Sequence, residues 1–250
     1  ASAIMLYGMS LIFGVSGSTI LEEINEAIAS GDANTPVVTL GITFVVIGFG
    51  FKVSAFPFHT WAPDTYEGAP TPVTAFLAVA SKAAGFVALM NLVIIGFIGQ
   101  EEVFQPLIWI LAALSMTAGN VMALRQTNIV RLMAYSGIAQ AGFILAPLAV
   151  AGEGSAIADK SVSAVVTYLV IYAAMNIGAF GIILAVSRKT RTADLQSYNG
   201  LFRTYPSLAV VMTIFLASLA GIPPLGGWYA KFSVFTSLTS ATTNWGYGLA

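Results

Sequence analysis

Long apolar runs alternate with short polar or Pro/Gly-rich segments along the whole chain. The runs cover about residues 1–16, 37–58, 72–98, 104–124, 129–150, 161–187 and 206–237, and another begins near Tyr247. Most are long enough for a membrane-crossing helix, which needs about 20 residues. The run from Leu107 to Ala118 lacks the alternating polarity of a membrane β-strand. The pattern predicts an all-α, polytopic transmembrane helix bundle, in which residues 1–250 form one domain of about seven spans plus the start of an eighth.

Composition excludes several classes of function. Hydrophobic residues make up 57% of the chain and charged residues 8%, which excludes a water-soluble globule. The formal net charge is −1, so no basic face is expected to bind nucleic acid. With no cysteine and one histidine, neither an iron–sulfur cluster nor another metal site is expected. The chain opens inside an apolar run with no signal-peptide features, so we interpret it as an internal fragment.

Loop charges predict the orientation, because Lys and Arg are retained on the cytoplasmic side while acidic residues count for little. If the spans alternate, one set of loops carries six basic residues and the other carries one. The first set holds Arg125, Arg131, Arg188, Lys189, Arg191 and Arg203; the second holds Lys160 with Glu22, Glu23, Glu26, Asp32, Glu101, Glu102, Glu153 and Asp159. Connections 124–129 and 188–205, and the segment 62–70, are therefore expected on the cytoplasmic face, or on the matrix or stromal face in an organelle.

Three lysines, Lys52, Lys82 and Lys231, lie inside apolar runs. A charge at bilayer depth costs at least about 2.5–3.5 kcal/mol, so a function is the default interpretation. Counted from Trp61 and Pro72, the expected inner ends of their spans, Lys52 and Lys82 lie roughly 14–15 Å deep. The alternative is that each pairs with an acidic residue or snorkels to an interface, which a side chain of about 6 Å does not reach. A row of desolvated, coupled lysines would form a proton relay.

Prolines and glycines interrupt two runs beside a lysine. The interrupted segments are Gly48 to Pro57 around Lys52, and Gly221 to Gly227, with Pro223 and Pro224, before Lys231. We expect the second helix to break and expose carbonyls, and the first to be interrupted more mildly. Broken helices at membrane depth lie in protein or line a water-filled cavity, and two such spans are typical of transporter repeats. The alternative at the second segment is a kink for close helix packing.

Two further polar residues are candidates for proton transfer. His59 could pass protons from the cytoplasm to Lys52, or it could only cap its helix. Gln140 lies between the two interrupted runs and could hold water, although an amide does not itself take up a proton at neutral pH. The spacing of four residues among Tyr168, Tyr172 and Asn176 is more typical of packing between helices than of a proton wire.

The string from Gly50 to Val73, GFKVSAFPFHTWAPDTYEGAPTPV, closely resembles the antiporter-like subunit N family of NADH:quinone oxidoreductase (complex I), related to mitochondrial and plastid subunit 2. The resemblance continues through Ser81-Lys82, the segment from Met122 to Ser136, and the segment from Gly221 to Phe232. It implies an antiporter-like fold of about fourteen helices with two inverted five-helix repeats, of which this chain would hold the sixth helix to the start of the thirteenth.

The resemblance also implies roles for individual residues. Lys52 matches the lysine of the broken seventh helix, Lys82 the connecting lysine of the eighth, and Lys231 the output lysine of the broken twelfth. The acidic partner of Lys52, on the fifth helix, would lie before Ala1. Many members have a histidine at the position of Gln140, so water would carry the proton there.

As a non-redox subunit of a proton-translocating enzyme, the chain is expected to hold no cofactor and no metal. Its expected partners are other membrane-arm subunits and the lipid bilayer, with quinone only indirectly and no nucleic acid. We expect a multi-pass protein of the bacterial inner membrane, or of a thylakoid or organelle inner membrane. One alternative is a subunit of a multisubunit cation/proton antiporter or of a membrane-bound hydrogenase, but the turn from Tyr66 to Pro70 favours complex I. The other alternative is a purely structural scaffold.

Overall fold

The computed structural model describes residues 1–30, 35–241 and 244–250, and the described part is a bundle of helices with one isolated β-bridge. Five segments are long and apolar enough to cross a membrane: α3 (Thr35–Lys52), the run Thr71–Gly96, α7 (Glu101–Ala123), α8 with its last turn (Ile129–Ala149) and α9 (Ser155–Thr190). A bent pair, α1 (Ser2–Ser16) with α2 (Leu21–Ala29), adds a sixth. The chain is therefore a multi-pass membrane protein, as the apolar pattern predicts.

The remaining helices are shorter. The run Thr71–Gly96 consists of α5 (Thr71–Phe76), a π-helical turn (Leu77–Ser81), α6 (Lys82–Asn91) and a second π-helical turn (Leu92–Gly96). The others are α4 (Trp61–Gly68), two 3₁₀ turns (Ala146–Ala149 and Leu195–Tyr198), α10 (Leu201–Thr204), α11 (Pro206–Ala220), α12 (Gly226–Thr239) and α13 (Asn244–Leu249).

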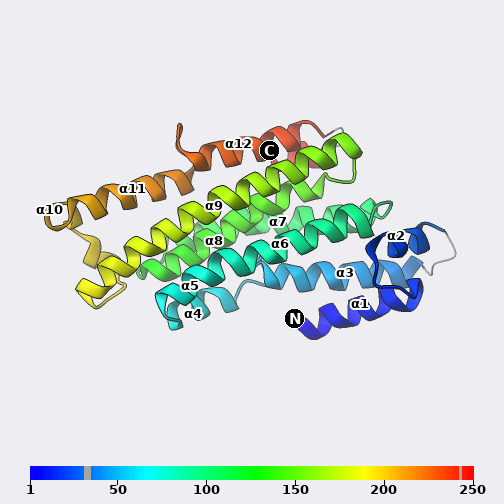
Figure 1. Ribbon diagram of the computed structural model, residues 1–250, viewed down its shortest axis with the longest axis horizontal. Coiled ribbons are helices and arrows are strands. Elements are labelled where there is room, and N and C mark those ends of the chain that lie inside the picture. The colour runs from blue at the N-terminus through cyan, green and yellow to red at the C-terminus, as the bar shows by residue number, and fades with distance from the viewer. Residues whose placement is uncertain (31–34, 242–243) are drawn as a thin grey trace.

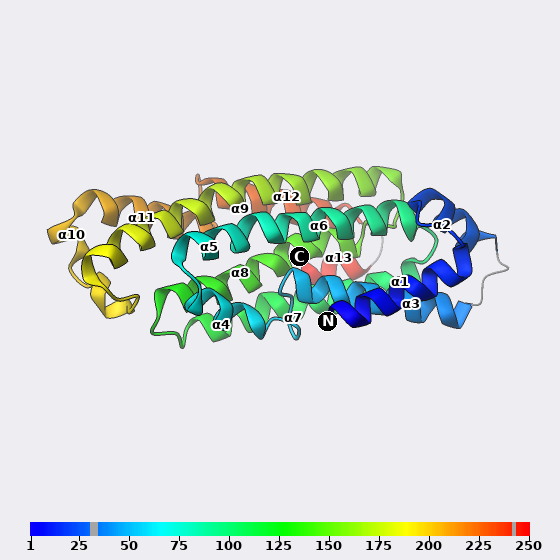
Figure 2. The same cartoon turned by 60° about the horizontal axis from the view of Figure 1, so that its bottom comes forward.

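The long helices lie side by side along the long axis of the molecule, with α8 in the middle (Figures 1 and 2). In the α8 span, 72% of the apolar window is buried, against 28–44% in the other four. α8 packs against α7 through glycines, because a Cβ on Gly119 would lie 2.5 Å from the backbone nitrogen of Ala139, and one on Gly142 2.8 Å from the carbonyl oxygen of Ala112. Small residues allow this approach between backbones, which is how membrane helices associate without a hydrophobic driving force.

The predicted charge asymmetry appears as two ends of the bundle. α4, α10 and the connection after α9 all lie toward the left in Figure 1, and the described residues of the basic set lie in or beside the connections there; we call this the basic end. Glu101 and Glu102 begin α7 at the opposite end, where α2 also lies. Which end faces the cytoplasm stays a prediction. Asp32, one of the predicted loop charges, lies outside the described residues.

Three sequence-based expectations about these elements are wrong. Trp61 does not end the span of Lys52: it begins α4, an eight-residue helix that buries Ala62 and Tyr66 on one face and exposes Asp64 and Glu67 on the other. The first interruption is a full break, since residues 53–60 separate α3 from α4. The acidic segment after α1 forms a helix, α2, because Ile24 and Ile28 recur at helical spacing and are buried.

Candidate functional site

The first broken helix stops at Lys52, the last residue of α3, and resumes at Trp61. Ser54 adopts the left-handed backbone region with φ 62°, which an L-residue adopts only where its surroundings enforce it. Side chains satisfy the freed backbone groups, because the Phe56 amide donates to Ser115 Oγ on α7 (2.9 Å) and Trp61 Nε1 donates to the Phe51 carbonyl (2.9 Å). Hydrogen bonds to side chains of α7 and α4 thus stabilise the backbone of the break.

Lys52 lies at this break but is not buried, which corrects the expectation of three buried lysines. Its side chain is exposed and lines a cavity of about 390 Å³ together with Ala84, Gly85 and Ala88 of α6. The small side chains on α6 leave this space, and a Cβ on Gly85 would lie 3.1 Å from Lys52 Cγ. The stem of Lys52 therefore packs on α6 one helical turn from Lys82.

Lys82 is the buried lysine of the three, with 2% of its surface exposed. It follows a π-helical turn, a feature often found at functional sites. Its Nζ donates to the Gly137 carbonyl of α8 (3.0 Å) and lies 5.9 Å from the centroid of the Tyr66 ring of α4. Among the described residues no carboxylate pairs with it, so an ammonium group is held here by a backbone carbonyl and an aromatic face.

The second broken helix separates α11 from α12 at residues 221–225, where both Pro223 and Pro224 lie, and confirms the expected break. The two half-helices approach so closely that a Cβ on Gly227 would lie 1.7 Å from the Ser218 carbonyl oxygen. The break also frees a backbone carbonyl, as expected. The carbonyl of Ala220, the last residue of α11, accepts a hydrogen bond from Lys231 Nζ (2.9 Å).

The half-buried side chain of Lys231 also contacts other groups. Its Nζ lies 4.7 Å from the centroid of the Phe143 ring, and the side chain lines a cavity of about 630 Å³ with Ser136 and Gln140 of α8. This cavity reaches Leu124 and Gln126, residues of the basic end. The hydroxyl residues Ser233, Thr236 and Ser237 line another cavity, of about 240 Å³, with Lys160.

Gln140 connects the middle of the bundle to the second break. The Tyr168 hydroxyl of α9 donates to Gln140 Oε1, and Gln140 Nε2 donates to the Leu219 carbonyl (3.0 Å), one residue before the carbonyl that accepts from Lys231. Gln140 also lies one helical turn beyond Gly137 on α8. The three lysines, Gly85, Gly137 and Gln140 therefore lie in a row across the bundle. Lys52 packs at Gly85, one turn from Lys82 on α6; Lys82 donates to Gly137, one turn from Gln140 on α8; and Gln140 and Lys231 line one cavity.

His59 lies beside this row, within the first break. Its ring stacks on Phe56 (centroids 4.9 Å apart) and lies 6.3 Å from the Tyr135 ring of α8. His59 is buried, and its Nδ1 atom has no hydrogen-bond partner. The structure thus places this imidazole in the break, beside α8, and its role in proton uptake stays a prediction.

Two residues shape the site without any signal in the sequence. Tyr66 is 1% exposed, its hydroxyl has no partner, and its ring faces Lys82. Gly137 leaves room for Lys82 because it has no side chain: a Cβ there would lie 3.2 Å from Lys82 Nζ and 3.1 Å from the Tyr172 hydroxyl. The sequence carries no signal for either role, because both depend on elements that meet only in the folded bundle.

Comparisons with known proteins assign the family. Residues 1–250 match the family described as NADH:quinone oxidoreductase/Mrp antiporter, transmembrane. The chain is 46% identical over 238 residues to NADH-quinone oxidoreductase subunit N of Desulforamulus reducens, with 95% of this chain and 48% of that protein covered. It is 45% identical over 237 residues to NAD(P)H-quinone oxidoreductase subunit 2 of Rippkaea orientalis, with 94% and 45% covered.

Among solved structures, the fold is similar to a chain of respiratory complex I from Thermus thermophilus. The TM-score is 0.79 at 31% identity, and the similarity covers 99% of this chain and 51% of that one. The chain thus spans about half the length of the relatives it matches. Because the family match runs through both breaks and all three lysines, the antiporter-like arrangement is that of the family, and this chain belongs to the NADH:quinone oxidoreductase/Mrp antiporter transmembrane family.

Proposed function

We propose that the chain is part of a proton-translocating membrane subunit of an NADH:quinone oxidoreductase, in which Lys52, Lys82 and Lys231 relay protons. The observation that carries this proposal is the buried Lys82 ammonium, which has no acidic partner among the described residues. A lone buried charge is costly and contributes nothing to packing that an apolar side chain would not supply. Its position between two lysine-bearing broken helices supports a relay.

The row of contacts supports a path for the proton. Lys52 packs on α6 one turn from Lys82, and Lys82 donates to α8 one turn before Gln140. Two like charges about 10 Å apart, at an effective dielectric constant of about 20, repel by about 1.7 kcal/mol. Protonating one lysine therefore biases its neighbour toward releasing a proton by roughly tenfold or more.

The middle of the row needs water. Gln140 neither accepts nor releases a proton at neutral pH, and its amide groups already bond to Tyr168 and to the Leu219 carbonyl. The cavity of about 630 Å³ that Gln140 shares with Lys231 is large enough for several waters. In this proposal water carries the proton between Lys82 and Lys231, with Gln140 as an orienting group.

Redox chemistry would take place in partner subunits. We propose that this chain moves protons without binding a cofactor, that other membrane-arm subunits couple it to quinone reduction, and that it resides in a bacterial inner membrane. The proposal rests on relatives named as NADH-quinone oxidoreductase subunit N in bacteria.

A multisubunit cation/proton antiporter subunit is the second candidate, because the family description includes Mrp antiporters. The identities of 40–46% to proteins named as quinone oxidoreductase subunits favour the first candidate. Proton movement that follows an imposed Na⁺ gradient without quinone reduction would favour the antiporter.

The experiment replaces Lys82 by Met in the full-length subunit within its assembled complex. We expect proton pumping and quinone reduction to fall together, because a blocked relay holds back the driving reaction. Lys82→Arg should lower both rates as far, since a guanidinium keeps its charge but does not release a proton. Lys189→Met, which removes a lysine at the basic end outside the row, is the matched control. Wild-type pumping by assembled Lys82→Met complex would exclude the relay.

A further inference from the structure

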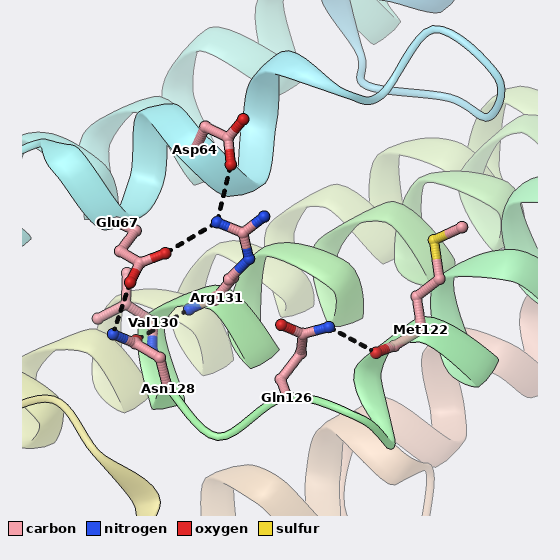
Figure 3. Close-up of polar contacts among 7 residues, drawn as sticks. All are labelled: Asp64, Glu67, Met122, Gln126, Asn128, Val130 and Arg131. Carbon is pink, nitrogen blue, oxygen red and sulfur yellow. Dashed lines mark hydrogen bonds and ion pairs between the residues drawn. The ribbon is translucent and has the colours of Figure 1, made fainter.

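One polar cluster at the basic end joins the first broken helix to α8. Arg131 Nη1 lies 2.7 Å from Asp64 Oδ1 and 2.8 Å from Glu67 Oε2, and Glu67 Oε1 accepts from Asn128 Nδ2 at 3.2 Å (Figure 3). We call these four residues the Arg131 cluster. Its two contacts to Arg131 are the ion pairs found among the described residues, and both join α4 to α8.

The cluster connects two elements whose relative position the backbone leaves open. α4 has eight residues and follows a non-helical break of residues 53–60, so contacts must hold it in place. Asp64 and Glu67 lie one turn apart on α4, and a guanidinium fork can bind both carboxylates at once. On the other side Asn128 caps α8 by accepting from the amides of Val130 and Arg131.

The same two elements form the surroundings of Lys82. Tyr66 lies between Asp64 and Glu67 in the sequence, but it faces inward and its ring lies 5.9 Å from Lys82 Nζ. Gly137, whose carbonyl accepts from Lys82, lies six residues after Arg131 on α8. The ammonium thus has one neighbour on each element that the Arg131 cluster joins.

We infer that Arg131 is a positioning residue: through Asp64 and Glu67 it holds α4 against α8, and so sets the Tyr66 ring opposite the Gly137 carbonyl around Lys82. This inference rests on the proposed relay through Lys82. A purely structural role would be weak, because the side chains of Asp64 and Glu67 are 72% and 40% exposed, and exposed ion pairs contribute little to folding. Loss of the cluster should therefore leave the complex assembled, and a small displacement of α4 beside Lys82 is then measurable in proton transfer.

The test compares Arg131→Gln with Arg125→Gln in the assembled complex. Arg125 is the matched control, since it carries the same charge at the same end and forms no ion pair among the described residues. At equal amounts of complex, we expect Arg131→Gln to pump roughly 3- to 10-fold more slowly, with a shifted pH profile, and Arg125→Gln to match the wild type. Arg131→Lys should recover part of the rate, because a lysine binds one carboxylate at a time.

A double-mutant cycle tests whether Arg131 acts through Tyr66. Tyr66→Phe keeps the ring and should retain pumping, whereas Tyr66→Leu should slow it. If Arg131 acts through this ring, Tyr66→Leu combined with Arg131→Gln should be no slower than the slower single variant. Multiplicative losses would instead show independent roles and overturn the inference.

Two other outcomes would also decide against the positioning role. The first is that Arg131→Gln lowers only the amount of assembled complex and leaves the rate and pH profile per complex unchanged. The second is that Arg131→Gln equals Arg125→Gln. Failure of the relay itself is recognised separately: if Lys82→Met pumps normally, the proposed function is wrong, but if Lys82→Met blocks transfer and Arg131→Gln does not slow it, only the positioning inference fails.

Discussion

Replacing Gly137 by Ala should impair proton transfer by weakening the hydrogen bond between Lys82 and the Gly137 carbonyl. A Cβ on Gly137 would lie 3.2 Å from Lys82 Nζ and 3.1 Å from the Tyr172 hydroxyl oxygen. Both distances are shorter than ordinary van der Waals contact, so at least one neighbour must move by a few tenths of an ångström. Both groups are buried and hydrogen-bonded, but Lys82 Nζ ends a flexible four-carbon side chain while the Tyr172 hydroxyl is fixed to a rigid ring, so the lysine end is the freer of the two.

The size of the effect follows from the hydrogen bond at risk. Lys82 Nζ donates to the Gly137 carbonyl over 3.0 Å, and Lys82 is 2% exposed. A hydrogen bond to a charged group contributes about 1.5–3 kcal/mol, and the shift weakens it without removing it. A loss of about 1–2 kcal/mol corresponds to roughly 5- to 30-fold slower transfer. Alanine favours the helix by about 0.5–1 kcal/mol over glycine, so α8 itself should remain folded.

The assay measures proton uptake into membrane vesicles that contain the assembled complex, driven by quinone reduction and normalised to the amount of complex. Gly181→Ala on α9 is the matched control, because a Cβ there meets nothing within 4 Å. It introduces the same methyl group into a helix of the same bundle and should pump at the wild-type rate. Equal pumping by Gly137→Ala and Gly181→Ala complexes would refute the role assigned to this carbonyl.

Three further predictions concern the broken helices and the topology. Lys52→Arg and Lys231→Arg should each slow pumping at least tenfold in the assembled complex, because arginine holds its proton at neutral pH; a normal rate for either removes that lysine from the relay. Gly227→Ala should lower the thermal stability of the complex, since its Cβ would lie 1.7 Å from a carbonyl oxygen of α11, and an unchanged melting temperature would contradict this packing. Reporter tags at Gln196 and at Gly31, which lies outside the described residues, should report opposite faces with Gln196 cytoplasmic; the same face for both would overturn the span count.

Much of the architecture could be predicted from the sequence because the bilayer imposes a length and a polarity on each span. Five of the apolar runs correspond to the long helices, and the double proline at residues 223–224 predicts the second break. The first break is less visible in the sequence, because Pro57 is its one proline and helix α4 follows it with polar residues at Asp64 and Glu67. A hydropathy pattern assigns such a segment to a surface connection, although Ala62 and Tyr66 are buried.

Some features of the candidate site could likewise be predicted from the sequence, and others only the structure shows. The sequence by itself determined that Lys52, Lys82 and Lys231 lie in apolar runs, because one charge in such a run is visible without any neighbour. The tertiary structure alone decided that Lys82 is the buried one, that its partner is the Gly137 carbonyl, and that Gln140 connects it to the second break. Burial and hydrogen-bond partners depend on groups as far apart in the chain as Gln140 and Leu219, and only the packing of α6, α8 and α11 brings such groups within hydrogen-bonding distance.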